Sequence, residues 1–178
     1  PAELPPPMLD GVRHLVGGPL ADALVERLAG GTDHEEAIEE RVVNRALNAG
    51  ALAGERNGQV DVFNFEEQRI STVLHFHKLP VFDIKSVASK NEVLLSSEDG
   101  SVSVWDLTDL KMLYSFKVAD AAVRVITISQ DEKTVAFGCK DNTVRVYDLK
   151  DYSLLYVLDQ HTLPLSSLQF SPDGKQLI

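Results

Sequence analysis

Two groups of side chains have residue types and spacing that could bind a metal ion. The first combines one histidine with three glutamates in a short stretch of predicted helix: His34, Glu35, Glu36 and Glu39. The second is His75 with His77, which on a strand would project from the same face. A solvated acidic face at a helix start explains the first group better, and His77 has a structural place in the repeat described below. We therefore predict no metal site and no cofactor.

The single cysteine, Cys139, is the only thiol available for nucleophilic chemistry. It follows Gly138 in a predicted strand among apolar residues, where nothing would activate it, and strand alternation points Lys140 to the opposite face. The sequence contains no phosphate-binding loop, dinucleotide-binding glycine pattern, nucleophile elbow or zinc-protease motif. We predict that the protein is not an enzyme.

Composition excludes several further classes. The chain has 178 residues, 44% of them hydrophobic and 25% charged, which is ordinary for a folded protein. Its formal net charge of -10 argues against general nucleic-acid or anionic-membrane binding, because both need clustered Lys and Arg. One cysteine permits no internal disulfide and fits a reducing compartment. We expect a cytoplasmic protein, with the nucleus as the alternative.

The first part of the chain differs from the rest. Residues 1–77 contain no lysine, whereas residues 78–178 contain nine. Three prolines at 5–7 predict an extended linker over residues 1–18. In residues 19–49 the apolar spacing and a capping box, Thr32 with Glu35, predict two helices that end before Gly50. The alternative is a degenerate sheet unit, because Val42 and Val43 stand where a first strand would fall.

From residue 50 onward the sequence repeats. The segments 57–64 (NGQVDVFN), 99–106 (DGSVSVWD) and 141–148 (DNTVRVYD) follow one another at intervals of 42 residues. The segments 77–81 (HKLPV) and 161–165 (HTLPL) are two periods apart, and 129–133 (SQDEK) and 171–175 (SPDGK) one period. Each period reads as four short strands separated by turns, in the middle unit about 81–87, 92–97, 101–106 and 111–117. A four-stranded period in the low forties is typical of a propeller blade.

Residues 50–178 thus resemble the WD-repeat family of β-propellers. The resemblance rests on Asp99 with Trp105-Asp106, on Asp141 with Tyr147-Asp148, and on the histidines that open two units. It implies a mainly β fold, with about three four-stranded blades after a short helical segment. Because closed propellers usually have four to eight blades, we expect that further blades or another chain complete the ring.

The resemblance also implies two sets of functional residues. In this family a His–Ser/Thr–Asp–Trp hydrogen-bond network often stiffens a blade. One unit matches the network fully, with His77, Ser97, Asp99 and Trp105. The unit that follows it matches in part, with Asp141 and Tyr147, but has Ala119 and Cys139 at the His and hydroxyl positions. His161 stands at the His position of the last unit. The family's partner-binding rim maps onto Arg56, Lys78, Pro80, Glu98, Asp120, Ala122, Lys140, Thr162 and Pro164.

We therefore predict a non-catalytic scaffold that binds proteins or peptides through the propeller rim, and neither nucleic acid nor membranes. Two alternatives stay open. One is the regulatory propeller of a larger multidomain signalling NTPase whose catalytic module lies outside this chain. The other is an engineered fusion of a helical segment to propeller blades, suggested by the change in composition.

Overall fold

The computed structural model describes residues 42–178 except 48–49, 65–66, 164 and 166, and these belong to one compact unit, Val42–Ile178. The predicted linker 1–18 and the predicted helices as far as residue 41 lie outside the described residues. So do the glutamates and the histidine that could form a metal site at 34–39.

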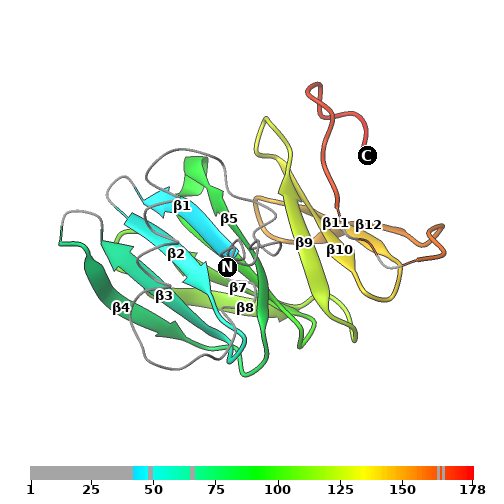
Figure 1. The fold of residues 1–178 in the computed structure, drawn as a ribbon. Helices are drawn as coiled ribbons and strands as arrows, with labels where there is room; N and C mark the ends of the chain where they lie inside the picture. The colour runs from blue at the N-terminus through cyan, green and yellow to red at the C-terminus, as the bar shows by residue number, and fades with distance from the viewer. Residues whose placement is uncertain (1–41, 48–49, 65–66, 164, 166) are drawn as a thin grey trace, which may run out of the picture. The chain divides into compact units, whose positions relative to one another are not determined.

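The described residues form twelve strands in three four-stranded antiparallel sheets (Figure 1). The first sheet contains β1 (Val42–Leu47), β2 (Gly50–Gly54), β3 (Gln59–Asn64) and β4 (Arg69–His75). The second contains β5 (Val81–Val87), β6 (Glu92–Ser97), β7 (Ser101–Asp106) and β8 (Met112–Lys117), with a 3-10 turn, η1 (Ala88–Lys90), after β5. The third contains β9 (Val123–Ile128), β10 (Thr134–Cys139), β11 (Val144–Asp148) and β12 (Leu154–Leu158). In each sheet the strands follow one another in chain order, as in a meander.

The predicted strands of the middle unit are confirmed almost residue for residue. The one difference is that β8 begins at Met112 rather than Lys111. Turn chemistry explains the accuracy, because Asp99-Gly100 directs a tight hairpin between β6 and β7, and Gly100 has a positive φ of 81°. The Cβ of any other residue there would collide with the carbonyl oxygen of Ala119.

The helix predicted to run through Leu47 is wrong over its last part. Val42–Leu47 form strand β1, which pairs antiparallel with β2 from Val42 opposite Gly54 to Leu47 opposite Gly50. The alternative interpretation, a first strand at Val42 and Val43, fits this segment. The helical spacing of its apolar residues was overridden by hairpin pairing with the next strand, β2, which the periodicity of a single segment does not reveal.

The middle sheet packs against both neighbouring sheets through side chains on the two faces of its strands. In β7, the fully buried Val102 and Val104 face the third sheet and join a core that includes Phe137 and Tyr147. Trp105 projects from the other face and packs with Leu52, Val62 and other residues of the first sheet. The middle sheet is therefore held between two neighbours, as expected for a blade.

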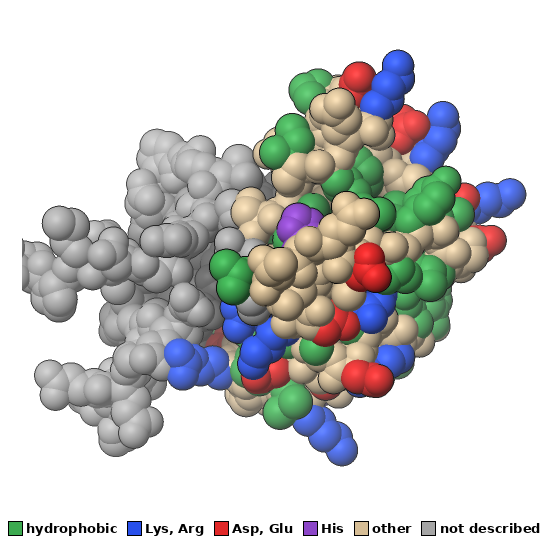
Figure 2. Space-filling model, turned by 90° about the vertical axis from the view of Figure 1, so that its right-hand side faces the viewer, with side chains coloured by type: hydrophobic (Ala, Val, Ile, Leu, Met, Phe, Trp, Pro, Cys, Tyr) green, Lys and Arg blue, Asp and Glu red, His purple; other side chains and the backbone are tan. Residues whose placement is uncertain are grey.

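Strand β5 contacts both β1 and β9, the first strands of the neighbouring sheets, so each sheet presents its first strand toward the others and its fourth strand outward (Figure 1). The far face of the third sheet buries Val144 and Val146 against Leu165 and Leu168. All five residues of β12 are exposed. Figure 2 views the side on which β12 lies and shows hydrophobic side chains at the surface among acidic and basic ones. No helix of the described residues is long and apolar enough to cross a membrane.

Polar contacts join the second and third sheets at the end of the strands where β5 meets β6. The carboxylate of Glu132 accepts hydrogen bonds from the backbone N–H groups of Ala88 (3.1 Å) and Ser89 (2.7 Å). Nearby, the buried hydroxyl of Tyr152 donates to Glu92 Oε2 at 2.8 Å. The ammonium of Lys90 lies 3.1 Å from the same carboxylate. The hydrogen bonds of Glu132 and Tyr152 thus link the second sheet to the third.

Candidate functional site

Four connections come together at the opposite end of the strands, and we call them the upper rim. They are residues 76–80, 98–100, 118–122 and 140–143, which follow β4, β6, β8 and β10. Backbone hydrogen bonds lock each hairpin turn to a neighbouring connection: Glu98 N donates to Pro80 O (2.9 Å), Ala119 N to Gly100 O (3.1 Å) and Lys140 N to Ala122 O (2.8 Å). The rim backbone is thus held rigidly while side chains project from it.

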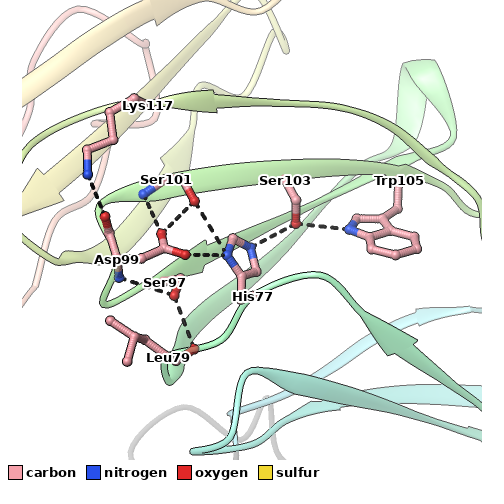
Figure 3. Close-up of polar contacts among 8 residues, drawn as sticks. All are labelled: His77, Leu79, Ser97, Asp99, Ser101, Ser103, Trp105 and Lys117. Atoms are coloured by element: carbon pink, nitrogen blue, oxygen red, sulfur yellow. Dashed lines mark hydrogen bonds and ion pairs between the residues drawn. The ribbon is translucent and has the colours of Figure 1, made fainter.

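A buried hydrogen-bond network lies beneath the rim of the middle sheet (Figure 3). The ring of His77, whose side chain is 1% exposed, contacts Asp99 Oδ2 through Nδ1 (3.1 Å) and Ser103 Oγ through Nε2 (2.9 Å). Trp105 Nε1 donates to the same Ser103 oxygen at 2.9 Å. The chain of contacts therefore runs from the Asp99 turn to the indole in the core, and it ties the β4–β5 connection to β7.

The prediction for the hydroxyl member of this network was wrong. Ser103, not Ser97, bridges His77 and Trp105, because residues two apart on β7 share a face. Ser97 Oγ instead donates to Leu79 O at 3.2 Å and accepts from Asp99 N at 3.3 Å, so it holds the hairpin turn (Figure 3). The alternation of 101, 103 and 105 was the signal in the sequence that identifies Ser103.

Asp99 is the charged member of the network. Burial raises the pKa of its carboxyl, but hydrogen bonds from Ser101 and His77 outweigh this and hold the pKa below its usual 3.8. Ser101 donates to Oδ1 through both its hydroxyl (2.5 Å) and its N–H (2.8 Å). The carboxylate is therefore the favoured form in the folded protein.

The third sheet replaces the histidine network with an arginine. Arg145, one period after Ser103, reaches Asp141 Oδ2 (3.0 Å) and Thr143 Oγ1 (2.7 Å). Tyr147 takes the place of the tryptophan and packs edge-on against Phe137, with ring centroids 5.4 Å apart. In this sheet Asp141 therefore pairs with Arg145, while Tyr147 contributes ring packing.

Sequence comparison identifies the repeats independently. The family model described as WD domain, G-beta repeat matches residues 68–106, 110–148 and 152–178, together more than half of the chain. The chain belongs to the WD40-repeat family. The first matched WD40 repeat contains β4 and then β5 to β7, and the second contains β8 and then β9 to β11, so each of these two repeats supplies the outer strand of one sheet and three strands of the next.

One curated relative and one solved structure are similar to this chain. The chain is 25% identical over 134 residues to mouse (Mus musculus) guanine nucleotide-binding protein subunit beta-like protein 1. This match covers 74% of the chain and 41% of the relative, so the chain spans less than half of that protein's length. A chain in the crystal structure of the mitotic checkpoint complex superposes with a TM-score of 0.66 at 18% identity, over 72% of this chain and 40% of that one. The second likeness shows the WD40 propeller fold.

The structure separates the rim residues that the WD40 resemblance proposed into three groups. Six are exposed: Arg56, Lys78, Glu98, Asp120, Lys140 and Thr162. Pro80 is half-buried. Ala122 is 3% exposed and is not a surface residue, because the connection folds its methyl group into the core. Pro164 lies outside the described residues.

His161 and His75 contribute little to the site. His161 is exposed, and its membership of a WD40 network stays a prediction. His75 Nδ1 contacts Gln59 Nε2 at 3.1 Å. Since His77 is engaged with Asp99 and Ser103, the two histidines make separate contacts.

Sequence reasoning missed two residues at the inner edge of this rim, Phe82 and Arg124. The guanidinium carbon of Arg124 lies 5.6 Å from the centroid of the Phe82 ring. The two residues are one 42-residue period apart, each second in its inner strand. Comparing these equivalent positions along the repeat would have paired them.

Proposed function

We propose that this chain is a non-catalytic scaffold that binds protein partners through the upper rim. The observation that carries the proposal is the combination of a locked backbone with exposed charged side chains. Each hairpin turn of the rim in the second and third sheets is bonded to a neighbouring connection at 2.8–2.9 Å, while Lys78, Glu98 and Lys140 stay exposed. Because the rim backbone is already ordered, the scaffold loses little conformational entropy when a partner binds, and this favours affinity.

The chemistry of the network agrees with a structural rather than a catalytic role. His77 is buried, and both ring nitrogens are engaged with Asp99 and Ser103. Cys139 is fully buried, and burial raises the pKa of its thiol, with only a partial opposing effect from Arg145. Neither side chain presents a free reactive atom at the surface.

Affinity capture with the full chain, quantified by mass spectrometry, tests the proposal. One variant neutralises four rim side chains, with Lys78→Gln, Glu98→Gln, Asp120→Asn and Lys140→Gln. The matched control neutralises four exposed side chains at the other end of the strands, with Asp109→Asn, Lys111→Gln, Lys150→Gln and Asp151→Asn. We expect the unaltered chain and the control to recover the same partners in similar amounts, and the rim variant to recover several-fold less of them. Equal recovery with both variants, or loss with the control alone, would contradict the proposal.

A further inference from the structure

The strand pairing is irregular at the same position of two inner strands, β5 and β9. At each position the irregularity changes the direction of one side chain. In the second sheet Val81 pairs with Ser97 and Asp83 with Ser96, which leaves Phe82 without a partner. In the third sheet Val123 pairs with Cys139 and Val125 with Gly138, which leaves Arg124 without a partner. Such bulges turn a side chain away from the regular alternation and occur often at functional sites. Both bulges lie next to the upper rim.

The two re-aimed side chains meet each other. Arg124 is exposed, and its guanidinium lies over the half-buried ring of Phe82 at 5.6 Å from the ring centroid. An arginine stacked on an aromatic ring has already lost part of its rotamer freedom, while its N–H donors remain available at the edge of the guanidinium plane. A planar donor fork of this kind fits a carboxylate in a bidentate manner.

Arg124 lacks the internal carboxylate partner that two other arginines of the described residues have. Arg69 pairs with Glu67 at 2.8 Å and Arg145 with Asp141 at 3.0 Å. Among the described residues, Arg124 makes the ring contact but no ion pair. Lys140, whose backbone N–H is bonded to the carbonyl two residues before Arg124, adds a second exposed cation close by.

We propose that the Phe82–Arg124 pair is a docking point for an Asp or Glu side chain on an extended segment of a partner protein. This inference rests on the proposed function and specifies what the inner edge of the rim recognises. The ring orients the guanidinium, the guanidinium binds the partner's carboxylate, and Lys140 supplies further positive charge. Asp120, the carboxylate of the adjacent connection, disfavours partner segments with several consecutive acidic residues.

The test starts from a displayed library of random dodecapeptides selected on the immobilised full chain. We expect peptides with an Asp or Glu at a fixed position. The best peptide and its counterpart with the amide in place of that carboxylate are then titrated by fluorescence anisotropy. Binding is measured to the unaltered chain, to Arg124→Gln, to Phe82→Leu and to the control Lys150→Gln, which lies at the far end of the strands.

The expected result is a coupling between Arg124 and the peptide carboxylate. Changing the carboxylate to an amide should weaken binding to the unaltered chain and to Lys150→Gln about tenfold, and binding to Arg124→Gln hardly at all. Phe82→Leu should weaken acidic-peptide binding about threefold, because the leucine fills space without a ring face.

Two results would overturn this inference: selected peptides that need no Asp or Glu for binding, or an acidic peptide that binds Arg124→Gln as tightly as it binds the unaltered chain. If such peptides still lose binding with the rim variant carrying Lys78→Gln and its three companions, the proposed function stands without it. If no peptide is enriched, or if the selected peptides bind that rim variant unchanged, the rim proposal fails as well.

Discussion

Ser103 is the residue that joins the rim to the core. Its hydroxyl contacts both the His77 ring and the Trp105 indole at 2.9 Å, and its side chain is fully buried. A single hydroxyl can serve both groups because it both donates and accepts. Removing it leaves a buried indole N–H without its acceptor.

We predict that Ser103→Ala lowers the free energy of unfolding by about 1–3 kcal/mol, the usual cost of an unsatisfied buried polar group. Urea unfolding followed by the fluorescence of Trp105, the only tryptophan, measures this directly. The matched control is Ser115→Ala, an exposed serine opposite Ser103 on β8, which should change stability by no more than about 0.5 kcal/mol. Equal effects of the two changes would show that the network does not stabilise the sheet.

Asp99 makes the stability of the middle sheet depend on pH. Its pKa in the folded state lies below 3.8, because hydrogen bonds from Ser101 and His77 outweigh the effect of burial. A lowered pKa contributes stability above the unfolded value, and this contribution disappears as pH falls through the folded value. The thermal midpoint of the unaltered chain should therefore exceed that of Asp99→Asn most clearly near pH 5, and the difference should narrow toward about pH 3. A difference that stays constant over this range would contradict the assignment.

For individual residues, the sequence allowed the positions of the network residues to be predicted better than the contacts that they make. The positions of His77, Asp99 and Trp105 could be predicted because the repeat places them at fixed offsets. Which hydroxyl bridges them depends on the direction of side chains in β7, and the burial of Ala122 depends on how its connection packs. Both are set by the folded backbone and not by a motif.

Among the elements, the strands of the second and third sheets were predictable because turn residues separate alternating apolar runs. Strand β1 was not, because its apolar residues also fit a helical period and its structure comes from pairing with β2. The bulges at Phe82 and Arg124 were equally hidden. Each results from a shift in pairing between two strands, which no local pattern in either strand encodes.

The second and third sheets are further joined by Tyr152, which donates to the buried Glu92 at 2.8 Å. Burial and then the Glu92 carboxylate raise the pKa of Tyr152, so it remains a protonated donor. Tyr152→Phe should lower the free energy of unfolding by about 1–3 kcal/mol, because the Glu92 carboxylate loses its hydrogen-bond donor, and the urea midpoint should fall accordingly. Tyr156→Phe, on β12 and 65% exposed, is the matched control and should be nearly neutral. Equal midpoints for the two variants would mean that the inter-sheet contact contributes nothing.

At the scale of the whole described unit, the packing of the middle sheet between two neighbours explains why both faces of its strands are apolar. The far face of the third sheet follows the same pattern, with Val144 and Val146 aligned with Leu158 and Tyr156 of β12. The rim loops are joined to one another by backbone hydrogen bonds and expose charged side chains. The central claim is that partners bind at these loops.

Hydrogen–deuterium exchange tests that claim most directly, with the full chain measured alone and bound to the best peptide from the library selection. We predict slower exchange on binding at residues 76–80, 98–100, 118–124 and 140–143, and unchanged exchange at residues 88–91, 107–111, 129–133 and 149–153 at the other end of the strands. Protection confined to those far loops or to β12, with the upper rim unchanged, would contradict the account.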